Sequence, residues 1–222
     1  MSGDNDGPRA RAPAASTSSS PGAYREHGGG RVGDVAGPRA PPFFRPDTKL
    51  LVPPLNCSMV ASGVWRSGHP LPLNFAFLDK LALRTIIYVG DKNMQAAYLG
   101  WAQERGIRVH HIRMESCKLP FVENDPGAVT AALEVLADGR NLPVLVHSDK
   151  GKHRVGVLVG AMRKILQNWS LASVFDEYSQ FAAGKEDGDI EFIEIFQARI
   201  VYDPAHAPRW LRAGAGCVAR PE

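Results

Sequence analysis

The stretch PVLVHSDKGKHRVGVLVGAMRKILQN, residues 143–168, joins a short apolar run, a loop rich in glycine and lysine, and a long apolar segment. The run PVLVH predicts a buried strand, and the segment that opens at Arg154 predicts a central helix. In an open α/β sheet, ligands bind beyond the carboxyl ends of the strands, which is where this loop falls. The stretch therefore indicates both the fold class and the place of a ligand site.

Strands and helices alternate on either side of this stretch. Further strands are expected on both sides of a turn at Ser62-Gly63 and in two β-branched runs, RTIIYVG (84–90) and IRVHHIRM (107–114). Helical patterns are NFAFLDKLAL (74–83), NMQAAYLGWAQERG (93–106), PGAVTAALEVLADG (126–139), SLASVFDEYSQFAAG (170–184) and DIEFIEIFQARI (189–200). This alternation predicts an α/β domain with a mostly parallel central sheet flanked by helices.

Residues at the predicted helix ends have the expected types. Asn74, Asn93, Ser170 and Asp189 stand at helix starts, and Gly106 and Gly139 stand at helix ends. Val129, Leu133 and Leu136 recur at helical spacing and are expected on one buried face.

Composition divides the chain into three parts. Residues 1–46 are rich in Gly, Pro, Ala and Arg without apolar periodicity, so they are expected to be disordered, and they indicate no particular protein partner. Residues 47–202 carry the patterns of one folded domain. Residues 203–222 are again punctuated by Pro and Gly, and a loose C-terminal tail is expected there.

Charge and composition exclude several function classes. The chain has 222 residues, 44% hydrophobic and 22% charged, with a formal net charge of +3, which is too small to favour nucleic acid. No apolar run is long enough to span a membrane, and no secretory signal pattern opens the chain. Three scattered cysteines predict neither a disulfide framework nor a metal site. A cytoplasmic or nuclear protein is expected.

The loop 148–154 has the features of a phosphate-binding site. Gly151 permits a tight turn whose backbone N–H groups form a nest for an anion. The helix that follows adds the positive end of its dipole, and Arg154 offers a fork that grips two phosphate oxygens. Lys150, Lys152 and His153 add basic character. The alternative, a lysine-rich surface loop, does not explain this spacing.

The loop resembles the cysteine-phosphatase signature His-Cys-x5-Arg-Ser/Thr, and GKHRVG resembles the loop of the plant-and-fungal atypical dual-specificity phosphatases. Other stretches with the same resemblance are VPPLN (52–56), VWRSGHPLPLNFAFL (64–78), LRTIIYV (83–89), CKLPFV (117–122) and QNWSLASVFDEYSQFA (167–182). The resemblance extends over about residues 50–197. It implies a single protein-tyrosine-phosphatase-like domain.

The resemblance also implies a ligand and site residues. Members of this family hydrolyse phosphotyrosine-type substrates, several act on inositol pyrophosphates, and no metal or other cofactor is used. The ligand is expected to be an inositol pyrophosphate or a phosphoprotein. It would be held by the loop residues Asp149, Lys150, Gly151, Lys152, His153 and Arg154, with Lys118 extending the basic patch. His147 and Arg66 match positions that support the loop.

Three departures from the family pattern concern catalysis. Ser148 stands where the family has its nucleophilic cysteine, and a serine hydroxyl needs an adjacent base, for which Asp149 and His153 are the local candidates. Val155 stands where the family has Thr or Ser. The segment 185–192 is shorter and more acidic than expected.

Two hypotheses follow. In the first, the protein captures a phosphorylated ligand and its catalysis is impaired. In the second, it is an active phosphatase, either slow with Ser148 or an engineered Cys-to-Ser trap of a cysteine enzyme.

Two further groups have competing interpretations. Asp125 is a candidate general acid, with Glu123 beside it, although Asp125 can equally complement the dipole of the helix that follows. Cys117 is either a surrogate thiol near the pocket or an inert buried one.

Overall fold

The structure is a computed structural model that describes residues 50–184, 187–212, 214 and 216–220. The tail 1–46, expected to be disordered, lies outside the described residues, as do residues 185–186 of the acidic segment. Among the described residues, no helix combines the length and apolar character needed to cross a membrane.

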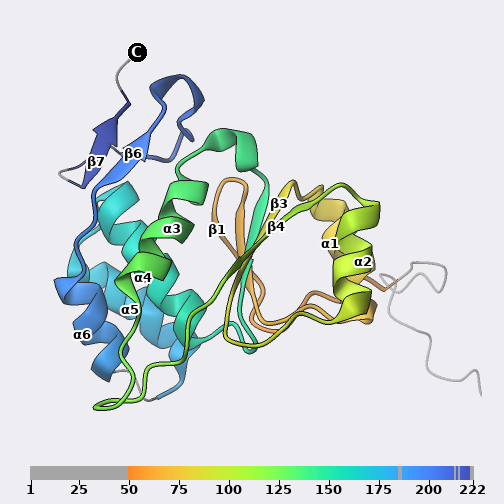
Figure 1. Ribbon diagram of the computed structural model, residues 1–222, viewed down its shortest axis with the longest axis horizontal. Helices are drawn as coiled ribbons and strands as arrows, with labels where there is room; N and C mark the ends of the chain where they lie inside the picture. Colours follow the sequence, from red (N-terminus) through yellow and green to blue (C-terminus); the bar gives the residue numbers. More distant parts are fainter. Residues whose placement is uncertain (1–49, 185–186, 213, 215, 221–222) are drawn as a thin grey trace, which may run out of the picture. The chain divides into compact units, whose positions relative to one another are not determined.

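A five-stranded sheet with the order β1-β2-β5-β3-β4 forms the centre of the domain (Figure 1). β1 pairs antiparallel with β2, whereas the pairs β2–β5, β5–β3 and β3–β4 are all parallel. The strands are β1 (Ser58–Ala61), β2 (Val64–Ser67), β3 (Thr85–Val89), β4 (Arg108–Ile112) and β5 (Val144–His147). The predicted mostly parallel sheet is confirmed.

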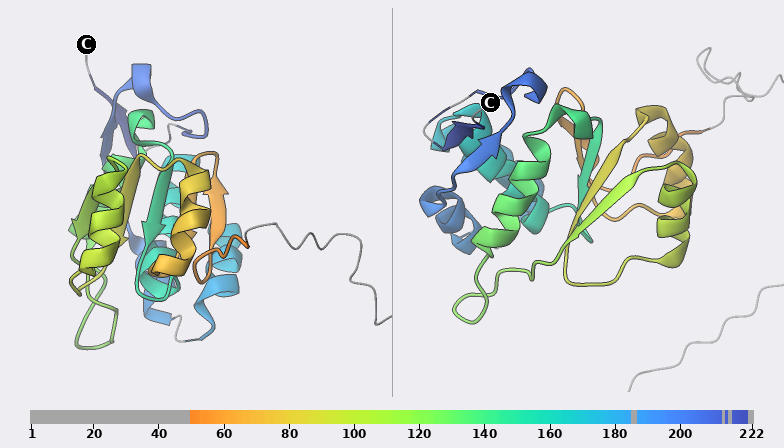
Figure 2. Two further views of the ribbon diagram at one scale, coloured as in Figure 1. Left: turned by 90° about the vertical axis from the view of Figure 1, so that its right-hand side faces the viewer. Right: turned by 45° about the horizontal axis from the view of Figure 1, so that its top comes forward.

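The helices cover both faces of this sheet (Figures 1 and 2). One face packs against α1 and α2, and the other against α3, α4, α5 and α6. Their bounds are α1 (Phe75–Leu78), α2 (Ala96–Glu104), α3 (Pro126–Leu136), α4 (His153–Gln167), α5 (Leu171–Ala182) and α6 (Asp187–Ile195).

β5 lies in the middle of the sheet and is buried on both faces. Leu145 packs into the cluster beneath α1 and α2, while Val144 and Val146 pack into the larger cluster on the opposite face. This division follows from the alternation of side chains along a strand. It explains why PVLVH is apolar without interruption.

Most predicted helix ends are close to the observed ones. Ser170 caps α5 with its hydroxyl, which accepts from the backbone N–H of Ser173, and Gly106 follows α2 with a positive φ of 64°. α2 begins at Ala96 rather than Asn93, because the Asn93 side chain accepts a hydrogen bond from Arg113 instead. α3 ends at Leu136, three residues before Gly139, which opens a short 3-10 turn.

The segment after residue 202 differs from the expected loose tail. β6 (Ile200–Tyr202) pairs in parallel with β7 (Cys217–Ala219), and Trp210 and Leu211 pack against the main core. The indole N–H of Trp210 donates to the Ser62 carbonyl at 3.2 Å. The Pro and Gly residues of this segment therefore mark turns between ordered pieces.

Candidate active site

The phosphate-type loop connects the end of β5 to the first turn of α4. Gly151 has a positive φ of 69°, and a Cβ there would overlap the backbone of Ser67 and Gly68. Only glycine fits this position. Its N–H donates to the Ser148 hydroxyl oxygen at 3.1 Å, which places that hydroxyl at the base of the loop.

Three carbonyl groups of the loop are bonded to the surrounding scaffold. The Asp149 carbonyl accepts from the His69 N–H at 3.2 Å, and the Lys150 carbonyl accepts from the Asn56 amide at 2.8 Å. The Gly151 carbonyl accepts from the Arg66 guanidinium at 3.0 Å. Since C=O and N–H point in opposite directions across a trans peptide, the N–H groups of Lys150, Gly151 and Lys152 point away from the scaffold, and that of Gly151 is the one bonded to the Ser148 hydroxyl. This peptide orientation is typical of an anion nest.

Arg66 lies beneath the loop and is 1% exposed. Its guanidinium stacks over the Phe181 ring, with 3.7 Å between the guanidinium carbon and the ring centroid. Burial lowers the pKa of Arg66 to about 10, so the group is still a cation at neutral pH. Its contacts are with the back of the loop rather than with the pocket.

His147, the last residue of β5, is fully buried below the loop. One ring nitrogen lies 3.0 Å from the Tyr98 hydroxyl, and the ring stacks on Tyr88 with 4.9 Å between centroids. Burial, together with the nearby His69, lowers the pKa of His147 to about 3. The ring is therefore neutral at physiological pH.

Arg154 opens toward the pocket and is held by two carboxylates. Its Nη1 lies 2.5 Å from an oxygen of Asp91 and 3.2 Å from the Met114 carbonyl, and its Nη2 lies 3.3 Å from an oxygen of Asp149. The hydrogen bond from Arg154 holds the pKa of Asp91 below its usual value. Asp149 also pairs with Lys92, at 2.9 Å.

Asp149 is a charged member of this network. Burial acts to raise the pKa of its carboxyl, but hydrogen bonds from Lys92 and Tyr88 and the charge of Arg154 outweigh that effect. The pKa is therefore below its usual value. Asp149 takes part through its backbone in the nest and through its side chain in pairing with Arg154.

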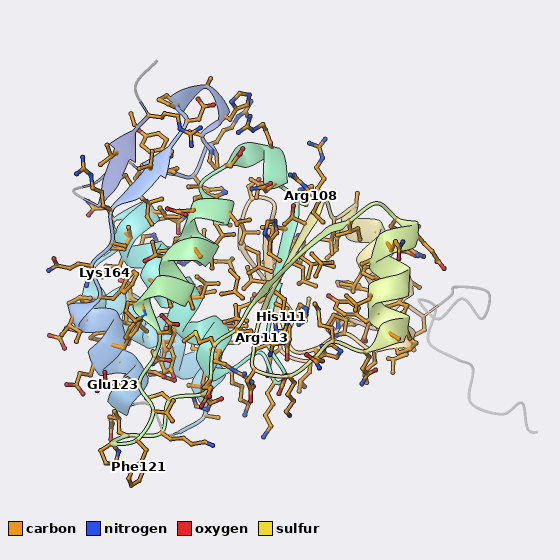
Figure 3. The ribbon with its side chains drawn as sticks, in the orientation of Figure 1. Arg108, His111, Arg113, Phe121, Glu123 and Lys164 are labelled. Atoms are coloured by element: carbon orange, nitrogen blue, oxygen red, sulfur yellow. The ribbon has the colours of Figure 1, made fainter. Side chains whose placement is uncertain are left out.

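Asp91 and Lys92 are site residues that the sequence analysis missed. They follow β3, which is the parallel neighbour of β5, so their backbone lies at the same edge of the sheet. Arg113 braces this segment by donating to the Asp91 carbonyl at 3.2 Å, and Figure 3 shows Arg113 just beyond β4. The sequence signal that could have identified them is a pair of charged residues directly after a predicted strand, where the ligands of an open α/β sheet bind.

A pocket of about 230 Å³ lies over the loop. Its lining consists of Ser116, Ser148, Asp149, Lys150, Lys152, His153 and Arg154. The predicted loop residues thus surround one hollow, except Gly151, which is not part of its lining. Of the residues that line it, only Ser116 lies outside the loop.

His153 faces this pocket from the first turn of α4. Its Nδ1 lies 3.1 Å from the Tyr178 hydroxyl and 3.2 Å from a carboxylate oxygen of Asp189. Both partners come from helices on the same face of the sheet, α5 and α6. The sequence analysis gave neither of them a site role.

The structure does not bring Asp125 to the pocket. Its carboxylate accepts from the backbone N–H groups of Gly127 and Ala128 and so caps α3. Glu123 and Phe121 lie along the neighbouring loop, which extends past the end of α3 (Figure 3). The contacts of Asp125 correspond to the helix-capping alternative.

Cys117 and Lys118 lie outside the pocket above the loop. Both line a separate hollow with Asp187, Gly188 and Asp189. Burial, followed by the charge of Asp189, raises the pKa of the Cys117 thiol, which disfavours the reactive thiolate. Val155 is fully buried in the core.

What the site offers a ligand is positive charge and backbone N–H groups. Within the described ranges, no three His, Cys, Asp or Glu side chains come together as ligands for a metal ion. An anion with several oxygens is the chemistry that the nest, the start of α4 and Arg154 accommodate.

Known proteins are similar in sequence to most of the described chain. A profile of the tyrosine phosphatase family matches residues 51–213. Inositol diphosphatase DSP4 of Arabidopsis thaliana is 46% identical over 149 residues, covering 67% of this chain and 75% of that protein. The tyrosine-protein phosphatase-like protein OCA2 of Saccharomyces cerevisiae is 44% identical over 155 residues, covering 67% of this chain and 77% of that protein.

A solved structure shares the fold. The core catalytic domain of the PP-IP phosphatase SIW14 from S. cerevisiae, in complex with citrate, superposes with a TM-score of 0.61 at 36% identity. The match covers 67% of this chain and 89% of that one. The expected fold, with its mostly parallel sheet and flanking helices, is thereby confirmed.

Proposed function

Because this chain belongs to the tyrosine phosphatase family, we propose that it binds a phosphorylated polyanion in the loop 148–154 and that its catalysis is impaired. The ligand is an inositol pyrophosphate or a phosphotyrosine-type group. The catalytic weakness comes from Ser148, which stands at the position of the family's nucleophile.

One observation carries the binding half of the proposal. The three loop carbonyls are bonded outward to His69, Asn56 and Arg66, so the N–H groups of Lys150 and Lys152 point away from the scaffold, toward the side where an anion would lie. Lys150, Lys152, His153 and Arg154 line the same pocket. The names of relatives such as the inositol diphosphatase of Arabidopsis favour a polyphosphorylated ligand.

The contacts of Ser148 support the catalytic half. Its hydroxyl accepts from the Gly151 N–H, and no side chain among the described residues is hydrogen-bonded to it. The pKa of a serine hydroxyl is several units higher than that of a cysteine thiol, and the loop dipoles cannot lower it enough to ionise the hydroxyl near neutral pH. Neither Asp149, paired with Lys92 and Arg154, nor His153, paired with Asp189, contacts the Ser148 hydroxyl as a base.

Phosphate release from a diphosphoinositol polyphosphate tests both halves. We expect the wild-type chain to bind this compound with little turnover and Ser148→Cys to release phosphate at least about a hundredfold faster. Val155→Thr alone serves as a matched control, because it restores the other family residue without a nucleophile. Equal rates for the wild type and Ser148→Cys would contradict the assignment of Ser148, and failure of both to bind would contradict the site.

The second candidate function is an active phosphatase, and the diphosphatase names of the relatives favour it. In that case Ser148 turns over slowly, or the serine was introduced into a cysteine enzyme as a trap. The codon at position 148 in the genomic sequence distinguishes slow turnover by a natural Ser148 from an engineered trap, because a serine codon excludes the trap.

A further inference from the structure

A connected group of side chains lies behind His153. The Tyr178 hydroxyl donates to a carboxylate oxygen of Asp189 at 2.5 Å, and the Nδ1 of His153 lies 3.2 Å from that same oxygen. The other oxygen of Asp189 accepts from the Asn124 amide at 2.7 Å. α4, α5, α6 and the loop before α3 thus meet at one carboxylate.

The partners of Asp189 determine which nitrogen of His153 carries a hydrogen. Asp189 is 3% exposed, and its neighbours Tyr178 and Asn124 both donate to it. Because the Tyr178 hydroxyl donates its hydrogen to Asp189, Nδ1 of His153 faces two acceptors, the Tyr178 hydroxyl oxygen and the Asp189 carboxylate oxygen. It must carry a hydrogen to bond either of them. In the neutral ring, Nε2 is then the acceptor nitrogen.

The other side of the His153 ring, which carries Nε2, faces the pocket. The side chain is 34% exposed and lines the hollow with Ser148 and Arg154. Its Nε2 has no hydrogen bond to any residue that the structure describes. A ligand in the pocket is the natural partner for that nitrogen.

We propose that Nε2 of His153 takes up a proton when a tetrahedral dianion enters the pocket and donates it to the ligand as a hydrogen bond. Asp189 and Tyr178 are positioning residues that fix the ring for this purpose. The proposal rests on the proposed function, because it assumes that the loop binds an anion.

The charges around His153 account for the coupling. Lys152 and Arg154 line the pocket beside the ring, and the Asp189 carboxylate lies 3.2 Å from Nδ1 on the ring's other side. A dianion bound in the pocket adds negative charge on the Nε2 side, so with Asp189 on the Nδ1 side a positive charge on the ring is favoured in the complex.

The other titratable groups facing the pocket hold their charge near neutral pH. Lys150, Lys152 and Arg154 are of types that are protonated there. The pKa of Asp149 and that of Asp91 are held below the usual value, and the pKa of His147 is about 3. Tyr178 and Asp189 contact His153 from behind the ring, at 3.1 and 3.2 Å from Nδ1. His153 is therefore the lining residue whose side-chain type changes charge between about pH 5 and 8.

Calorimetric titration of the full-length chain with sulfate tests the proposal. Sulfate is a tetrahedral dianion that keeps its charge over this range, so any proton exchanged belongs to the protein. Repeating the titration in buffers of different ionisation enthalpy gives the number of protons taken up. We expect up to about one proton per sulfate, and an affinity that falls about tenfold per pH unit in the upper part of the range.

Four variants make the assignment specific. His153→Gln keeps a side chain that can donate to Asp189 but does not titrate, so proton uptake should disappear. Asp189→Asn and Tyr178→Phe should each reduce the uptake, and Tyr178→Phe decides the question if Asp189→Asn fails to fold. His206→Gln is the matched control, because His206 also pairs with an aspartate, Asp203 at 2.7 Å, but outside the pocket.

Each contrary result has a distinct meaning. If sulfate does not bind the wild-type chain, the proposed function fails together with this inference. If sulfate binds without proton uptake, or if the uptake persists in His153→Gln, the inference alone is overturned. Unchanged uptake in both Asp189→Asn and Tyr178→Phe would overturn their positioning role.

Discussion

Arg154 can bind an anion with two N–H groups at once, but its guanidinium is already bonded to two carboxylates. Asp91 lies 2.5 Å from one of its nitrogens and Asp149 lies 3.3 Å from another. A phosphate that uses the Arg154 fork must displace or share these contacts. The two carboxylates therefore oppose an anionic ligand in two ways: they occupy the Arg154 guanidinium, and their negative charge repels the ligand.

The first residue-scale prediction concerns this competition. Asp91→Asn removes a negative charge but keeps the shape of the side chain, so sulfate should bind about three- to tenfold tighter at pH 7. The effect is modest because the Asp91 side chain is 48% exposed and its charge is screened by water. Calorimetric titration of both proteins measures it.

A matched control exists on another exposed ion pair. Asp138→Asn removes a carboxylate that is paired with Arg140 at 2.7 Å, but outside the loop pocket, and sulfate affinity should not change. Equal or weaker binding by Asp91→Asn would mean that Asp91 does not compete with the ligand for Arg154.

At the scale of secondary-structure elements, α3 separates two interpretations of Asp125. Because its carboxylate caps the helix, Asp125→Ala should lower the free energy of unfolding by about 1 kcal/mol, whereas Asp125→Ser should stay close to the wild type. Urea unfolding measures this difference.

The general-acid interpretation makes a different prediction for the same position. In the Ser148→Cys background, Asp125→Ser should leave phosphate release unchanged if the helix cap is the only role of Asp125. A large loss of turnover in this folded variant would assign Asp125 to the chemistry despite its place outside the pocket.

Local signals explain which elements the sequence could predict. β5, the loop and α4 follow one another without interruption, so apolar patterning and the position of Gly151 were sufficient. The capping of α5 by Ser170 is equally local. The start of α2 was misplaced because Asn93 is bonded to Arg113, twenty residues away in sequence.

Contacts between distant elements explain what the sequence could not predict. Asp91 reaches Arg154 only because β3 lies beside β5, and Asp189 reaches His153 only because α6 packs against α4. β6 and β7 pair although Pro and Gly dominate the segment between them; Ile200 is buried in the main core and Cys217 packs against it. Side-chain roles of this kind depend on tertiary packing, which periodicity does not encode.

At the scale of the whole molecule, the two hydrophobic clusters meet along β5, and the site sits at its end. The side chains of Val144 and Val146 face one cluster and that of Leu145 faces the other. His147 terminates the strand within this buried region, below the nest. The stability of the domain is thereby linked to the neutral state of a histidine under the active loop.

This link predicts how the domain responds to acid. The folded-state pKa of His147 is lowered to about 3, mainly by burial, whereas a histidine in the unfolded chain has a pKa of about 6.5. Between these values the unfolded chain binds more protons, so stability falls as the pH falls from about 6.5. Between pH 7 and pH 5, His147 alone should cost about 2 kcal/mol of unfolding free energy.

His147→Asn tests the assignment, because it removes the titrating ring while keeping a polar side chain. Its unfolding free energy should depend about 2 kcal/mol less on pH than that of the wild type between pH 7 and pH 5, whatever its absolute stability. The burial of His69 lowers its pKa as well, so a smaller acid sensitivity of the same sign should persist in His147→Asn. If the unfolding free energy of His147→Asn falls with acid as steeply as that of the wild type, His147 is not the source of the pH dependence of stability.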